Sequence, residues 1–145
     1  MAEMETVSLT IPARPEGVHQ ARDAVRKLIT SWGPEHLIDD LILCLSEAVS
    51  NAITHAAHGS MLPVRVSRTD TCIRIEIEDG DRHPPVLALP AELVLSGRDL
   101  PDRLLEEHGR GLFLIDALAT RWGVQPCPTG KIVWLERDLT KPLVQ

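Results

Sequence analysis

The segment at residues 34–56 constrains the fold of this chain more than any other part of the sequence. Apolar residues recur in it at helical spacing, and they form a stripe that is unusually wide for a surface helix. The residues of this stripe are Leu37, Ile38, Leu41, Ile42, Leu45, Ala48, Val49, Ala52 and Ile53. We therefore expect a central core helix of about 20 residues, which corresponds to about 30 Å.

Local patterns predict the elements around this helix. Alternating apolar and polar residues indicate strands, helical spacing indicates helices, and glycine or proline marks the turns. In chain order we expect a strand at 6–12, a helix at 15–31, strands around 64–66 and 73–77, a helix at 111–118, and strands around 122–124 and 132–135. Tight turns between strands predict an α+β two-layer sandwich, with helices on one face of a mixed, mostly antiparallel sheet.

Composition narrows the classes of function. The chain has 145 residues, which suits one domain over 1–145. Its net charge is −6, and nucleic-acid binders usually carry the opposite sign, so we expect no direct nucleic-acid partner. Cys44, Cys72 and Cys127 form no closely spaced pair and are expected to be reduced core residues of a cytoplasmic protein. No apolar run approaches the roughly 20 residues of a membrane span, so we expect no membrane partner.

Polar residues interrupt the apolar pattern of the central helix at regular intervals. Glu47, Asn51 and His55 are spaced by four residues and therefore line one side of the helix. One interpretation is a solvated helix face. The other is a ligand site, since a carboxylate and an amide oxygen one turn apart suit a hydrated Mg²⁺ that also binds substrate phosphates.

Two further motifs follow the central helix. Asp79 comes at the end of the strand around 73–77, where an Asp-Gly pair often forms only a turn. Its carboxylate could instead accept a hydrogen bond from the exocyclic amine of a base. Gly109 and Gly111 then precede a short helix, and glycines at a helix N-terminus allow phosphate to approach the free backbone N–H groups.

Together, these motifs resemble the Bergerat-type ATP-binding fold of the GHKL superfamily. The order is Glu-x-x-x-Asn on a long helix, an Asp at a strand end, and Gly-x-Gly after a long loop. Within this superfamily, the chain looks like the anti-sigma factor serine kinase-like ATPases, especially the single-domain regulators of actinobacteria. The resemblance covers about residues 6–136 and rests on four strings: LSEAVSNAITHA (45–56), IEIEDGDRHPP (75–85), HGRGLFLIDALATRWG (108–123) and GKIVWLE (130–136).

The resemblance implies a role for each matching position. Asn51 looks like the ligand of a Mg²⁺ that bridges the phosphates of ATP, and Glu47 looks like the carboxylate that activates or orients the attacking group. Asp79 is similar to the residue that reads the adenine amine. The resemblance implies a domain core at about residues 6–136 and a tail at 137–145. Within the core, residues 84–108 match the ATP lid. The other implied nucleotide-binding residues are Gly109, Arg110, Gly111, Leu112 and, by a looser match, Thr129.

Two positions depart from the family pattern. Larger relatives carry a glycine where this chain has Asp81, and sporulation kinases have an arginine where this chain has Glu107. In such kinases that arginine touches the terminal phosphate, and Arg110 and Arg103 are the possible substitutes here. These departures bear on phosphotransfer more than on nucleotide binding.

Three functions remain open from the sequence. The first is an ATP-dependent anti-sigma factor that sequesters a sigma factor and phosphorylates an anti-anti-sigma factor of the STAS type. The resemblance also implies a homodimer. The second is an interaction module that binds a sigma factor or its antagonist without phosphotransfer. The third is a small α+β domain whose polar helix face is only solvated.

Overall fold

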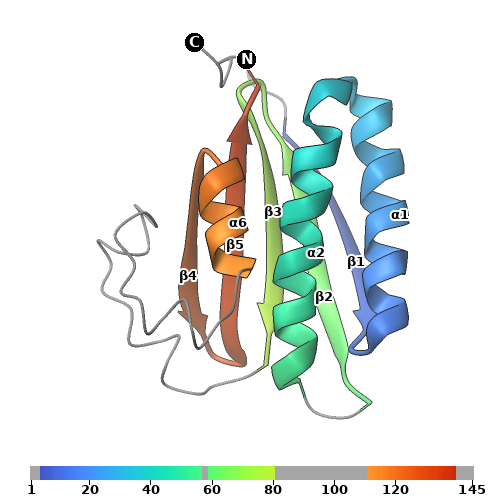
Figure 1. The fold of residues 1–145 in the computed structure, drawn as a ribbon, viewed down its shortest axis with the longest axis vertical. Helices are drawn as coiled ribbons and strands as arrows, with labels where there is room; N and C mark the ends of the chain where they lie inside the picture. Colours follow the sequence, from blue (N-terminus) through green and yellow to red (C-terminus); the bar gives the residue numbers. More distant parts are fainter. Residues whose placement is uncertain (1–3, 57–58, 81–110, 140–145) are drawn as a thin grey trace.

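The described part of the chain forms a sheet of five antiparallel strands, and its helices cover one face of that sheet (Figure 1). This computed structural model describes residues 4–56, 59–80 and 111–139. The strands are β1 (Glu5–Pro12), β2 (Met61–Arg68), β3 (Cys72–Asp79), β4 (Arg121–Cys127) and β5 (Gly130–Asp138), in the spatial order β1-β2-β3-β5-β4. The helices are α1 (Pro15–Trp32), α2 (Ile38–His55) and α6 (Gly111–Leu118), with a 3₁₀ turn, η1 (Glu35–Leu37), before α2. The expected α+β two-layer fold is confirmed, and all pairings between the described strands are antiparallel.

The helix α2 is the central element of the core, as its wide apolar stripe predicts. It contacts α1, α6 and β3. Leu41, Leu45 and Val49 are buried on it, and on the sheet Ile75 and Ile77 are fully buried. The expected start at residue 34 was early, because residues 35–37 form the tighter turn η1. Gly33 separates α1 from this turn with a φ of 114°, a conformation that glycine adopts without the steric penalty of a side chain.

A close backbone approach joins the end of β3 to the start of β5. Gly130 follows the β4–β5 turn with a φ of 150°, and a Cβ at this position would overlap the carbonyl oxygen of Asp79. Across the same two strands, Asp79 pairs in register with Lys131. Only glycine fits here, so Gly130 fixes how the end of β3 meets β5.

The second face of the sheet, which no described helix covers, carries linked ion pairs. Arg74 contacts Glu76 at 2.7 Å and Glu136 at 2.8 Å, and Arg121 donates to Glu136 at 2.9 Å. Burial would raise the pKa of Glu136, but the hydrogen bonds from Arg121 and Arg74 outweigh it and lower that pKa. The guanidinium of Arg74 also lies 4.5 Å from the ring centroid of Trp134. This face is therefore polar and internally paired.

Arg137 connects three elements at the other end of the helix layer. Its side chain is 5% exposed, and its Nη1 donates to Asp40 of α2 at 2.8 Å and to the carbonyl oxygen of Leu118 at 3.0 Å. A cation is favourable at the C-terminal end of α6 because of the helix dipole. The expected tail at 137–145 therefore began too early, since β5 continues to Asp138 and Arg137 is part of the core.

Cys44, Cys72 and Cys127 are free thiols, as their spacing predicted, but only Cys44 is buried. The expectation that all three are core residues was wrong for Cys72 and Cys127, which are half-buried at the beginning of β3 and the end of β4. Within residues 4–56, 59–80 and 111–139, no helix is both long enough and apolar enough to cross a lipid bilayer. The long loop expected at 84–108 and the residues after 139 lie outside the described part of the chain.

Candidate functional site

The polar side of α2 is neither fully solvated nor part of the apolar core. Glu47 and Asn51 are both half-buried and stand one helical turn apart. The carboxylate and the amide oxygen are hard donors of the kind that suits Mg²⁺, which needs few protein ligands when phosphates supply the rest. The described residues contain no group of three or more histidine, cysteine or acidic side chains that could hold a metal. A metal held here would therefore depend on a bound ligand for most of its coordination.

Asp79 is the last residue of β3. Its side chain points to the helix-covered face of the sheet together with Ile75 and Ile77, and it is 4% exposed. A buried carboxylate is costly unless it is paired. Its partner is Lys131 of β5, whose Nζ lies 3.0 Å from Asp79 Oδ2 and whose side chain is 3% exposed.

The role of Lys131 was missed in the sequence analysis. Strand alternation gave a usable signal, because Lys131, Val133 and Leu135 occupy every second position of β5 and therefore share one face. A lysine on the same face as buried Leu135 needs a buried anion. The anion is Asp79, which lies directly opposite in the β3–β5 register.

The elements that carry these residues converge at one end of the molecule. The carboxyl end of β3 and the start of β5 lie at the same end as the C-terminal end of α2 (Figure 1). The helix α6 also packs against α2 and begins at Gly111. Gly109 and Arg110, and the side chains of Leu112 and His55, lie outside the described residues. The described part thus combines a half-buried carboxylate and amide on α2 with a buried ion pair at the sheet end.

The side chain of Thr129 is not directed toward Asp79. Its hydroxyl donates to Glu78 at 3.0 Å, and it lies exposed in the β4–β5 turn. Glu78 precedes Asp79 in β3, so its side chain points to the opposite face of the sheet. The structure therefore does not bring the Thr129 side chain together with Asp79.

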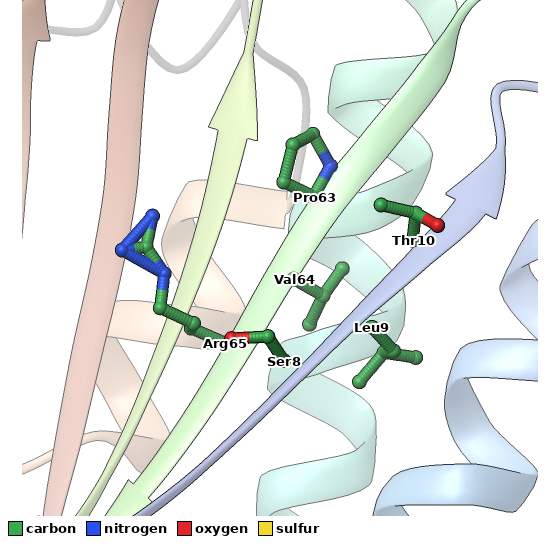
Figure 2. A pocket seen from close by; sticks show the side chains of 6 residues that line it. All are labelled: Ser8, Leu9, Thr10, Pro63, Val64 and Arg65. Carbon is green, nitrogen blue, oxygen red and sulfur yellow. The ribbon is translucent and has the colours of Figure 1, made fainter.

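One surface hollow of the described part lies at the β1 edge of the sheet. It lies along the edge strand β1 and its neighbour β2, and Figure 2 shows the residues that line it: Ser8, Leu9, Thr10, Pro63, Val64 and Arg65. The Arg65 side chain extends from it toward β3, where its guanidinium lies 3.6 Å from Glu76 and 3.7 Å from Glu78. This hollow does not include any of the predicted site residues.

The described part is a two-layer α+β fold whose central helix carries Glu47 and Asn51 and whose strand β3 ends in the buried Asp79. The family of histidine kinase-like ATPase domains matches residues 11–137, and this chain belongs to that family. The resemblance that the motifs indicated is therefore confirmed.

Curated relatives and a solved structure agree with this assignment. The chain is 29% identical over 122 residues to the serine-protein kinase RsbW of Oceanobacillus iheyensis, covering 81% of this chain and 77% of that protein. It is 29% identical over 134 residues to RsbW of Listeria monocytogenes serotype 4a, with 81% and 78% covered. An uncharacterized Streptomyces coelicolor protein is 35% identical over 83 residues, 56% of this chain and 69% of that one. The SiaB–SiaC complex from Pseudomonas aeruginosa contains a chain of similar fold, with a TM-score of 0.61 and 13% identity over 92% of this chain and 88% of that chain.

Proposed function

We propose that this chain is an ATP-dependent protein serine kinase that acts as an anti-sigma factor. It would sequester a sigma factor in the cytoplasm and phosphorylate an anti-anti-sigma factor of the STAS type. The observation that carries this proposal is that α2 bears the half-buried Glu47 and Asn51 and ends at the same end of the molecule as β3, whose last residue is the buried Asp79 (Figure 1). Similarity to serine-protein kinases named RsbW over four-fifths of the chain supports the choice of reaction.

Each residue has a role that its position supports. Asp79, buried and ionisable, would accept a hydrogen bond from the adenine amine. Asn51 would hold Mg²⁺, which neutralises charge on the phosphates when it is bound. Glu47, one turn earlier on the same side of α2, would orient or deprotonate the hydroxyl group of the protein substrate. Gly109 and Gly111 stay predictions for the phosphate-approach positions.

Nucleotide binding is the first test. Calorimetry with Mg-ATP should give binding to the wild-type chain and a large loss of affinity in Asn51→Ala and Asp79→Asn. Ser50→Ala is the matched control, because Ser50 is an exposed neighbour of Asn51 on the same helix. Circular dichroism checks that each variant is folded. Wild-type affinity in both site variants would contradict the residue assignment.

Phosphotransfer is the second test. The purified chain is incubated with Mg-ATP and candidate STAS proteins, and phosphorylated serine or threonine is read by peptide mass spectrometry. Candidate sigma factors are tested for a stable complex by size-exclusion chromatography, which also reports whether the chain is a homodimer. The sequence observation that favours the alternative function is Glu107, which stands where sporulation kinases have an arginine. Binding of a STAS protein without phosphotransfer would replace the kinase with an interaction module.

A further inference from the structure

Lys131 forms a buried ion pair that none of the roles assigned above requires. Its Nζ lies 3.0 Å from Asp79 Oδ2, and both side chains are nearly inaccessible to solvent. By contrast, the arginines of the uncovered sheet face remain 27–44% exposed in their ion pairs. The pair Asp79–Lys131 is therefore the most deeply buried of the ion pairs described.

Stability alone does not explain such a pair. Removing two charges from water costs several kcal/mol for each ion, and well-packed apolar residues at the same positions often give an equally stable protein. The neighbouring positions on this face show that alternative, since Ile77 lies opposite Val133 and Ile75 lies opposite Leu135. A buried charge pair at the end of the sheet that holds the candidate site is a candidate for function.

We propose that Lys131 is a second residue that recognises the base. Its ammonium would donate a hydrogen bond to N1 of adenine, the ring nitrogen next to the amine from which Asp79 would accept one. This inference rests on the proposed ATP-binding function. Adenine presents these two groups side by side on one edge, with the amine as donor and N1 as acceptor. The adjacent strands β3 and β5 present the complementary carboxylate and ammonium side by side in register.

The ion pair need not break when the base binds. An ammonium group has three donors, and an ionised carboxylate has two oxygens with about four acceptor sites. Lys131 can therefore keep one hydrogen bond to Asp79 and donate another to N1, while Asp79 accepts both from Lys131 and from the amine. The 3.0 Å contact between Lys131 Nζ and Asp79 Oδ2 neutralises the two charges within the buried pair.

The pair also defines what the site excludes. Guanine and hypoxanthine carry a carbonyl oxygen in place of the amine and an N–H in place of the acceptor N1. In the same orientation, the oxygen would face the carboxylate and the N–H would face the ammonium. Acceptor would then face acceptor and donor would face donor in a buried site, which gives strong discrimination.

The test compares ATP with analogues that lack single ring nitrogens. Calorimetry with Mg²⁺ uses the full wild-type chain and ATP, 1-deaza-ATP and, as control, 7-deaza-ATP, which lacks a nitrogen of the other ring. We expect 1-deaza-ATP to bind roughly 10- to 100-fold more weakly than ATP, the range for a hydrogen bond to a charged group. The control should bind like ATP, and GTP should bind at least about 100-fold more weakly.

Variants of Lys131 connect this effect to the side chain. Lys131→Met should bind ATP and 1-deaza-ATP with equal affinity, and Lys131→Arg, which keeps a cationic donor, should restore the difference. The wild-type comparison stands even if Lys131→Met, which removes the ammonium beside Asp79, fails to fold. Equal binding of ATP and 1-deaza-ATP by the wild type would overturn the role of Lys131 but leave ATP binding intact. No binding of ATP by the wild type would overturn the proposed function and this inference together.

Discussion

The contact between Arg137 and Asp40 gives a prediction in which the more exposed residue is the more costly one to remove. The Arg137 side chain is 5% exposed and that of Asp40 is 37% exposed. In Asp40→Ala, the guanidinium stays buried with the Leu118 carbonyl as its remaining acceptor among the described residues. In Arg137→Met, the carboxylate that remains can be hydrated, and methionine fills much of the vacated space.

The magnitudes follow from this asymmetry. Breaking a buried ion pair by removing one partner costs about 3–5 kcal/mol. Water can reach the vacated Asp40 position, so we expect the low end, about 3 kcal/mol, for Asp40→Ala. Asp40→Asn keeps an oxygen that accepts from Arg137 and should cost about 1 kcal/mol. Arg137→Met should also cost about 1 kcal/mol, since it leaves no buried charge unpaired.

Urea unfolding followed by circular dichroism measures these free energies of unfolding. For a chain of this size, 3 kcal/mol corresponds to a decrease in Tm of roughly 10 °C. Asp39→Asn is the matched control, because Asp39 lies in the same first turn of α2 and its side chain is 96% exposed. A larger loss of stability in Arg137→Met than in Asp40→Ala would refute the reasoning.

Three further predictions test other parts of the molecule. Burial raises the pKa of Cys44 from 9.0 to about 12, so its thiol stabilises the fold below pH 9, and this contribution is lost as pH rises toward 12. Between pH 8 and pH 10, the free energy of unfolding of the wild type should therefore fall by about 1 kcal/mol more than that of Cys44→Ala, as measured by urea unfolding. An equal decrease in both proteins would contradict this prediction. Gly130→Ala should destabilise by more than about 2 kcal/mol, because a Cβ overlaps the Asp79 carbonyl, whereas Gly59→Ala meets open space and should cost about 1 kcal/mol in the same assay. Glu47→Gln should slow phosphotransfer to a STAS protein by roughly 10²–10⁴-fold with little change in ATP affinity, and an unchanged rate would give Glu47 a structural role.

Much of the fold could be predicted from local pattern. The 3.6-residue period of α2 and the two-residue period of β2 and β3 require that one side of each element be buried. The predicted boundaries of the strands and helices agree with those of the structure within a few residues. The errors fell at helix and strand ends, where η1 replaces the first turn of the long helix and β5 continues through Arg137. Local propensity is weakest at such ends, because packing against distant residues decides them.

The candidate site was predictable only in part. The spacing of Glu47 and Asn51 places both on one side of a helix, and the resemblance assigned Asp79 a role before any contact was known. No local pattern could show that Thr129 would turn to Glu78 on the opposite face of the sheet. That outcome depends on how the β4–β5 turn meets the end of β3.

By itself, the sequence determined which residues of each helix and strand are buried, because periodicity depends only on the geometry of a single element. It also determined the family, because the order of the motifs is written along the chain. Only the tertiary structure decided the partners of the buried charges. Lys131 meets Asp79 through the β3–β5 register, and Arg137 meets Asp40 and Leu118 across the two layers. These contacts join residues 52, 97 and 19 positions apart, and a buried charge is stable only where such a distant partner is brought to it.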